Sequence, residues 1–389
     1  MQHNRICYVT EVDLEEIGGA ITNDRKTIDC LRKLGTVDVI YLQRRRRKSM
    51  IAALLFYALQ VSQSLSRQYN VYFSRGLISC LLLTFYKPVH RGKVVHQTLS
   101  VPLASAEVKH LGFGRLESFI RHCLFTFLER LVLPNADIIT VAAIEYAAEL
   151  IKIGVPEDKI HVVTFYIEDE FFKSPIKQAD EVFTLCYIGR FHMYHDLSVL
   201  IQAFELASTL KNTQMIMAGN GPLRPMIENE IMQKKLIGRI KIVGLIPHSS
   251  VPALLSRVDS FVYLSRKSGL STSLLEAAAA GKAIIALSTK EDKTLSRFFK
   301  HGKEIFLVDE FSPRKIAEAM TLLHDDSQLR SILAVGARRV AARYFSEEAA
   351  LLQLQTLLGS LSSSRKRCAN IISGALSSEA KKSLLMRNV

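Results

Sequence analysis

The sequence predicts an α/β protein built from two doubly wound, Rossmann-like domains. Its 389 residues are too many for one hydrophobic core, and they fit two domains of about 150 to 200 residues each. Short apolar runs typical of buried parallel strands alternate with stretches of helical spacing. Repeated β-α-β order requires right-handed crossovers and a parallel sheet that helices cover on both faces.

The first half of the chain supplies one set of alternating elements. Strands are predicted at residues 6–9, 37–42, 71–73, 93–96, 137–141 and 160–163. Helices are predicted at residues 23–34, 49–66, 77–86, 116–133 and 143–153. Gly35, Pro134 and Gly154 follow helices as stop signals, because glycine and proline commonly end them.

The same alternation resumes in the second half. Strands are predicted at residues 184–188, 214–218, 240–243, 260–264, 283–286 and 305–308. Helices are predicted at residues 196–209, 222–235, 250–257, 272–281, 294–300, 313–323, 328–345 and 346–358. A second parallel sheet follows from this order.

These patterns divide the chain into domains. We expect an N-terminal Rossmann-like domain at residues 1–165 and a C-terminal one at residues 183–345. Residues 166–182 lack a clean period, which indicates an interdomain linker. The helix at residues 346–358 is expected to pack back toward the N-terminal domain, and residues 359–389 to form a basic polar tail.

Composition limits the partners and the compartment. A formal net charge of +14 favours nucleic acid, anionic lipid or phosphorylated substrates as partners. The six cysteines show no Cys-x-x-Cys pair and no His/Cys cluster, which favours a reducing, cytoplasmic compartment over a disulfide framework or structural zinc. The N-terminus lacks the long apolar core of a signal peptide. The apolar segments 51–61 and 77–86 are shorter than the about 20 residues that span a bilayer.

Three segments place polar groups at the predicted carboxyl edge of the second sheet, where ligands of such sheets bind. In the first, Gly189 and Arg190 end a strand, and a helix begins near Asp196. A guanidinium held there can grip a diphosphate through two parallel hydrogen bonds, although a plain surface arginine is an even alternative. The second, residues 219–222, is a glycine-rich turn with Pro222 at the predicted helix start, a pattern that many α/β proteins share.

The third segment runs from the strand at 260–264 into a helix. Ser271 or Thr272 can cap this helix, whose free N–H groups and dipole suit an anionic diphosphate. Glu276 lies about one turn further on and can accept two hydroxyl hydrogens from a sugar ring, or can be a capping or surface glutamate. The small residues 277–281 predict tight helix packing beneath a site.

In combination, these segments resemble the retaining glycosyltransferases of family 4, which have the GT-B fold of two facing Rossmann-like domains with a cleft between them. That family shows a glycine-arginine turn followed by a basic residue, a Gly-x-Gly-Pro turn, two glutamates eight positions apart, and Glu-Ala-x-Ala-x-Gly-x-Pro-Val-Ile. The resemblance covers residues 182–345. The first half is similar more loosely, through Gly18 and Gly19 after the first strand, His96 at a strand end, and residues 154–160.

The resemblance implies an enzyme of EC class 2.4 that moves a sugar from a nucleotide-sugar to a glycan, lipid-linked or other hydroxyl acceptor, with retention of configuration. It implies that the C-terminal domain binds the donor and that the N-terminal domain lies on the acceptor side. Neither a metal nor a cofactor is implied, since an arginine and a helix N-terminus take the metal's place.

The resemblance also assigns roles to single residues. The positions that match donor-binding positions are Gly18, Gly19, Arg190, His195, Ser268, Gly269, Leu270, Ser271, Thr272 and Glu276. Arg190 neutralises the donor diphosphate, the backbone amides of residues 269–271 bind phosphate or donor sugar, and Glu276 binds the ribose. Gly18 and Gly19 leave room for the donor or acceptor. His96, assigned to catalysis with Arg190, approaches the transferred sugar.

The sequence departs from the family pattern at three places. The family's second basic residue, usually lysine, is His195, whose charge depends on pH near neutrality. The first of the paired glutamates is Ser268, and the neighbouring Arg266 or Lys267 could instead face an acidic donor sugar. Residues 165–166 read Phe-Tyr where an Asn-Gly turn is expected. An unusual donor, slow catalysis or a binding-only relative therefore stays open.

A run of cations precedes the apolar helix predicted at residues 49–66. The run consists of Arg44, Arg45, Arg46, Arg47 and Lys48. A cationic cluster beside an apolar helix is typical of a protein that binds the inner face of an anionic membrane, and a solvated basic loop is the alternative. Two further functions stay open: a sugar-nucleotide epimerase of the same fold, and a basic nucleic-acid-binding protein, for which no recognised motif is present.

Overall fold

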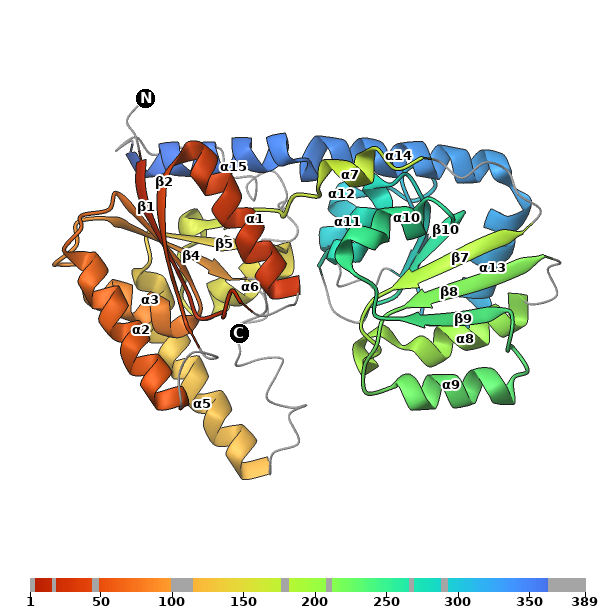
Figure 1. The fold of residues 1–389 in the computed structure, drawn as a ribbon, viewed down its shortest axis with the longest axis horizontal. Helices are drawn as coiled ribbons and strands as arrows, with labels where there is room; N and C mark the ends of the chain where they lie inside the picture. Colours follow the sequence, from red (N-terminus) through yellow and green to blue (C-terminus); the bar gives the residue numbers. More distant parts are fainter. Residues whose placement is uncertain are drawn as a thin grey trace, which may run out of the picture. The chain divides into compact units, whose positions relative to one another are not determined.

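The computed structural model describes residues 4–15, 19–43, 49–98, 115–175, 182–207, 212–265, 269–287 and 293–362. The chain divides into two compact units, one formed by Met1–Phe165 with Ala350–Val389 and the other by Tyr166–Ala349. Each unit contains one parallel six-stranded sheet (Figure 1). The predicted fold class of two doubly wound, Rossmann-like domains is therefore confirmed.

The first sheet has the strand order β2-β1-β3-β4-β5-β6. Its strands are β1 (Asn4–Thr10), β2 (Gly35–Tyr41), β3 (Val71–Arg75), β4 (Lys93–Thr98), β5 (Ile138–Val141) and β6 (Ile160–Val162). The helices of this half are α1 (Gly19–Leu34), α2 (Met50–Leu65), α3 (Leu77–Phe85), α5 (Arg115–Val132) and α6 (Ile144–Lys152). Side chains of α2, α3 and α6 share one buried cluster with Cys7 and Val9 of β1, so these helices cover one face. Tyr8 points to the opposite face, where its hydroxyl reaches Asp24 of α1.

Two helices of this half, α2 and α1, can be compared with their predicted bounds. Ser49 caps α2, since its hydroxyl accepts a hydrogen bond from the Ala52 N–H at 3.1 Å, and the predicted bounds were close for that reason. Helix α1 begins at Gly19, earlier than predicted, because Ile21 lies on its buried side. The helix ends at Leu34, directly before Gly35, as predicted. Gly35 is the first residue of β2, where a Cβ atom would overlap the Asn4 carbonyl oxygen.

The second sheet has the strand order β12-β11-β10-β7-β8-β9. Its strands are β7 (Phe183–Ile188), β8 (Thr213–Ala218), β9 (Ile240–Gly244), β10 (Ser260–Tyr263), β11 (Ala283–Leu287) and β12 (Phe306–Val308). The later helices are α7 (Asp169–Phe172), α8 (Leu197–Leu206), α9 (Arg224–Gln233), α10 (Val251–Leu255), α11 (Thr272–Ala279), α12 (Lys293–Phe298), α13 (Pro313–Asp325), α14 (Ser327–Phe345) and α15 (Glu347–Ser362).

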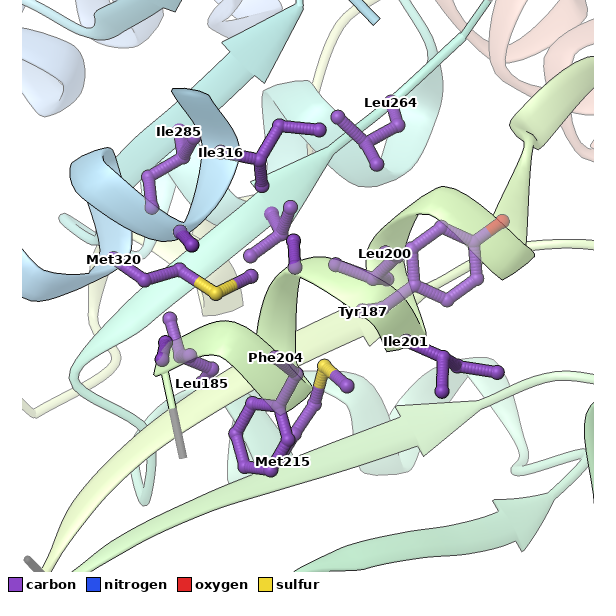
Figure 2. Close-up of a cluster of buried hydrophobic side chains, with 14 of the residues drawn as sticks. Leu185, Tyr187, Leu200, Ile201, Phe204, Met215, Leu264, Ile285, Ile316 and Met320 are labelled. Carbon is purple, nitrogen blue, oxygen red and sulfur yellow. The ribbon is translucent and has the colours of Figure 1, made fainter. Parts of the chain in front are cut away.

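Apolar layers cover both faces of this sheet. On one face, Leu200 and Phe204 of α8 pack with Met320 of α13 over Leu185 and Met215 of the central strands (Figure 2). On the other face, α10, α11 and α14 share a second buried cluster. The alanines of residues 277–280 are all buried, which confirms the predicted close packing of this helix.

The segment expected to be a linker contributes to the second unit. Phe171 of α7 is buried in its core, and the N–H of Ile167 donates to the Phe345 carbonyl at 2.7 Å. At the other end of the chain, Gln353 of α15 accepts a hydrogen bond from the Thr164 N–H at 3.1 Å, within the first unit. Helix α15 also continues to Ser362, beyond its predicted end at residue 358.

Candidate functional site

In the second sheet, the order in which successive strands are added reverses between β7 and β10. Strands β8 and β9 follow β7 to one side, whereas β11 and β12 follow β10 to the other. Strands β7 and β10 are parallel neighbours, with Leu185 opposite Ser260, so their carboxyl ends lie at the same edge. Loops that leave two such strands in opposite directions open a crevice between them, and open α/β sheets bind ligands there.

Arg190 lies at this edge, in the loop directly after β7. The Gly189 N–H donates to the Ala218 carbonyl at 3.0 Å, and the Tyr187 hydroxyl donates to the Arg190 carbonyl at 3.2 Å. These bonds fix the backbone of the loop. The Arg190 residue is exposed, and it forms no ion pair within the part of the chain that the structure describes.

The glycine-rich turn after β8 supports this loop from behind. A Cβ atom at Gly219 would overlap the Gly189 carbonyl oxygen, and one at Gly221 would overlap the Phe191 carbonyl oxygen. Gly219 also has φ +146°, which side chains rarely adopt. The glycines therefore allow the turn to pack against the Arg190 loop. The prediction for Pro222 was wrong: it lies in the turn, and α9 begins at Arg224.

His195 links the loop after β7 to the end of β10. Its Nδ1 lies 3.2 Å from the Leu264 carbonyl oxygen. Because a carbonyl only accepts, Nδ1 carries the proton, and Nε2 of the neutral ring is the hydrogen-bond acceptor. Asp196 occupies the N-cap of α8 with φ +46°, so this helix begins where it was predicted, although the Asp196 side chain makes no capping hydrogen bond.

The N-terminus of α11 lies beyond the end of β10. The Ser271 hydroxyl accepts a hydrogen bond from the Leu274 N–H at 3.1 Å, so Ser271 is the cap and Thr272 the first helical residue. The N–H groups of the first two helical positions have no acceptor within the helix. Gly269, at φ +109°, turns the chain into the cap, and the Tyr263 hydroxyl donates to its carbonyl at 3.3 Å.

Glu276 has a partner that the sequence did not indicate. Its side chain is only 4% exposed, and Oε1 lies 2.7 Å from Nε2 of His248, which is 45% exposed. The His248 ring also packs against Phe171, with ring centroids 5.6 Å apart. Glu276 is therefore neither a capping nor a surface glutamate. No short-range spacing could reveal this pair, because the two residues belong to separate elements.

Two of the predicted site residues belong to the first unit. Nδ1 of His96 lies 3.0 Å from the Ser74 hydroxyl of the adjacent strand, and burial lowers the pKa of His96 to about 4. The ring is therefore neutral at pH 7. Gly19 is the first residue of α1. The structure thus gathers Arg190, His195, Gly269, Leu270, Ser271, Thr272 and Glu276 in one unit, and His96 and Gly19 in the other.

Other predicted features lie outside the described residues. They are Gly18, Arg44, Arg45, Arg46, Arg47, Lys48, Arg266, Lys267 and Ser268. Among the helices that are described, none combines the length and apolarity needed to cross a bilayer. The described His, Cys, Asp and Glu side chains include no group of three placed to hold a metal ion.

Comparison with known proteins adds independent information. Residues 167–340 match the family model described as glycosyl transferases group 1. The chain is 25% identical over 214 residues to an alpha-D-kanosaminyltransferase of Streptomyces kanamyceticus, a match that covers 52% of this chain and 55% of the enzyme. It is 31% identical over 151 residues to a 2-deoxystreptamine N-acetyl-D-glucosaminyltransferase of Niallia circulans, with 38% of each chain covered. The matches thus span about half or less of these two relatives.

Solved structures agree with the fold. Anabaena Alr3699/HepE in complex with UDP superposes with a TM-score of 0.71 at 15% identity, covering 92% of this chain and all of that one. At this identity the similarity establishes a shared GT-B-like fold and nothing more specific.

Proposed function

We propose that the chain is a retaining glycosyltransferase of EC class 2.4, because residues 167–340 match the model of the glycosyl transferases group 1 family. The donor is a nucleotide-sugar, and the acceptor is a hydroxyl group of a glycan, a lipid-linked molecule or another compound. One observation carries the proposal. An exposed arginine after β7 and a helix N-terminus after β10 lie on neighbouring strands at the switch point of the sheet, and both suit one pyrophosphate.

The reaction makes a nucleoside diphosphate the leaving group. The bond between the anomeric carbon and the phosphate oxygen breaks, and a bond to the acceptor oxygen forms on the same face. The acceptor proton passes to the departing phosphate oxygen. Negative charge grows on the diphosphate during this step, and its stabilisation is the main contribution that the protein makes. The family is generally metal-independent, so Arg190 and the N–H groups at the start of α11 supply this stabilisation.

Each donor-binding residue then has a physical task. Arg190 pairs with the diphosphate, and His195 offers it Nε2 when protonated. The backbone at Gly269, Leu270 and Ser271, with Thr272, hydrogen-bonds phosphate or sugar oxygens. Glu276 accepts hydroxyl hydrogens from the ribose, and His248 fixes the carboxylate rotamer through its 2.7 Å contact. Gly18 and Ser268 complete this set.

His96 contributes differently from the cations of the second unit. Since its pKa is about 4, it carries no charge at neutral pH and cannot stabilise the leaving group electrostatically. We assign it to a neutral hydrogen bond with the transferred sugar, on the acceptor side, where Gly19 leaves room for the ligand.

The proposal also includes contact with an anionic membrane. The cations Arg44, Arg45, Arg46, Arg47 and Lys48 precede α2 in sequence and suit an anionic lipid surface. Buried thiols such as Cys7 and Cys186, free in the structure, are in keeping with a reducing cytoplasm. The protein would then work in polysaccharide or glycolipid synthesis at the inner face of a membrane.

The test combines binding with product analysis. UDP-, GDP- and ADP-sugars are screened by thermal shift, and we expect one of them to raise the melting temperature by several degrees. That donor, radiolabelled in its sugar, is then incubated with candidate acceptors. Transfer with the anomeric configuration of the donor retained supports the proposal. An epimerised nucleotide-sugar would identify an epimerase. Binding without turnover would identify an inactive relative, and salt-sensitive binding to generic RNA alone would overturn the proposal.

A further inference from the structure

The outer surface of the first unit carries three apolar stripes that no described residue covers. On α2, Ile51, Leu55 and Leu59 repeat at four-residue spacing and are 71%, 67% and 53% exposed. The opposite side of the same helix packs Ala53, Tyr57 and Val61 into the core. An ordinary surface helix has one apolar face, whereas α2 has two.

The neighbouring helices continue this surface. Phe85 and Val89, at and beyond the end of α3, are 75% and 65% exposed. On α5, Leu124, Phe127 and Leu131 follow helical spacing and are all more than half exposed. Helix α3 packs against both α2 and α5, and the three helices lie together in Figure 1. We call these eight side chains the apolar face. A contiguous exposed patch of this kind marks an interaction site.

Charge decides what covers the apolar face. Residues 50–65 of α2 and residues 77–85 of α3 contain no aspartate, glutamate, lysine, arginine or histidine. At the margins, Arg91 follows Val89, and Arg130 precedes Leu131 on α5; both are exposed. Glu129 is buried. The described charges on or beside this face are therefore positive, apart from two carboxylates that have partners. Glu11 accepts hydrogen bonds from Ser79 at the start of α3, and Asp137 pairs with Lys87 and Lys93.

A second copy of this chain, or the chain's own C-terminal segment, would complement these positive charges poorly. Two copies related by a two-fold axis would bring the same cations together. The chain's own residues 363–389 contain six lysines and arginines and one glutamate, so they also carry excess positive charge. An anionic bilayer complements both features, because apolar side chains enter the acyl boundary while cations meet the headgroups.

We infer that the apolar face of α2, α3 and α5 enters the surface of an anionic membrane. The inference extends the membrane contact proposed above, names the groups that enter the lipid, and favours a lipid-linked acceptor. It does not depend on the identity of the donor. Helix α2, about 24 Å long at 1.5 Å per residue, lies along the bilayer plane and does not cross it.

The first experiment measures vesicle binding of the full chain. Wild type should co-sediment with phosphatidylcholine vesicles that contain phosphatidylglycerol and much less with phosphatidylcholine alone. Replacing Ile51, Leu55 and Leu59 with serine should weaken this binding by about tenfold or more, since three insertable side chains are lost. Serine at Ile332 and Val335, which are exposed on α14 in the other unit, is the matched control and should bind as wild type does.

The second experiment locates the inserted residues. The chain contains no tryptophan, so Phe85→Trp, Phe127→Trp and the control Ile332→Trp each carry a single indole. Brominated lipids should quench the first two strongly and the control little. Binding without quenching would overturn the inference, because it would show a purely electrostatic contact. Unchanged binding of the serine variant, or its conversion of a dimer to a monomer in light scattering, would also overturn it. Donor-induced thermal shifts should stay unchanged, which separates this test from the proposed function.

Discussion

The two sheets place an arginine at their switch points, and they treat its charge in opposite ways. In the first sheet the strand order reverses between β1 and β3. Arg75, the last residue of β3, forms an ion pair with Asp24, whose side chain is fully buried. That carboxylate also accepts hydrogen bonds from the Tyr8 hydroxyl at 3.0 Å and the Thr10 hydroxyl at 2.9 Å. In the second sheet, Arg190 is exposed at the corresponding edge.

The comparison of Arg75 with Arg190 shows that the same position in a sheet can have different surroundings. Both sheets have a switch point in their strand order, and in both units an arginine lies at the carboxyl end of a strand beside it. The Arg75 guanidinium pairs with the chain's own Asp24 carboxylate and is part of the core structure. Burial lowers the pKa of Arg75, because burial disfavours the charged form. A guanidinium in water remains available to an anionic ligand. We therefore propose that charge pairing, rather than the fold, distinguishes an edge that binds an anionic ligand from an edge that is only structural.

The largest effect is expected from breaking the buried pair. Asp24→Ala removes the buried carboxylate that pairs with the buried Arg75 guanidinium and should cost about 3–5 kcal/mol of unfolding free energy. Urea unfolding measures this change. Asp29→Ala is the matched control on the same helix: its partner Arg32 and the aspartate are both more than half exposed, and the loss should be below about 1 kcal/mol. Equal losses in the two variants would refute a structural role for the Asp24 pair.

A second prediction concerns acid stability of the first unit. The pKa of His96 falls from its ordinary 6.5 to about 4 on folding, so the unfolded chain binds the proton more readily between these values. Stability contributed by the neutral ring is complete above pH 6.5 and is lost as pH falls toward 4, up to about 3 kcal/mol. His96→Asn should remove this component. Urea titrations between pH 7.5 and 4.5 test it, and parallel pH profiles for the two proteins would contradict it.

The sequence predicted what depends on local pattern. The apolar run at residues 283–286 is β11, and Ser49 and Ser66 bound α2, because burial and capping are visible in neighbouring residues. The family motifs also placed Arg190 and Thr272 at one edge of the second sheet, where the structure has them. Their roles in donor binding remain predictions.

Features that depend on distant residues escaped prediction. Residues 166–182 lack a period because α7 is only four residues long, yet Phe171 is buried through contacts with later elements. The pairs Asp24–Arg75 and His248–Glu276 form between elements that only the folded chain brings together. The sequence left open whether the apolar helix at residues 49–66 lies on a membrane or only covers the sheet, because an apolar helix with two apolar sides has the same composition as a buried one.

The smallest effect is expected on nucleoside diphosphate affinity when His248 is replaced. His248→Ala should weaken nucleoside diphosphate binding by about fivefold, or roughly 1 kcal/mol, because the Glu276 carboxylate loses the bond that orients it. Binding of inorganic pyrophosphate should not change, since the proposed function places Glu276 and His248 on the ribose side. Isothermal titration of both ligands measures the difference. An equal loss for pyrophosphate would place His248 at the phosphates instead.

We propose that the exposed guanidinium of Arg190 and the N-terminus of α11 bind one pyrophosphate. Isothermal titration of the preferred nucleoside diphosphate into wild type and Arg190→Ala tests it most directly, with urea unfolding of both proteins as the control for folding. We predict at least about tenfold weaker binding by Arg190→Ala, with stability unchanged to within about 0.5 kcal/mol. Equal affinity of the two proteins would contradict the account.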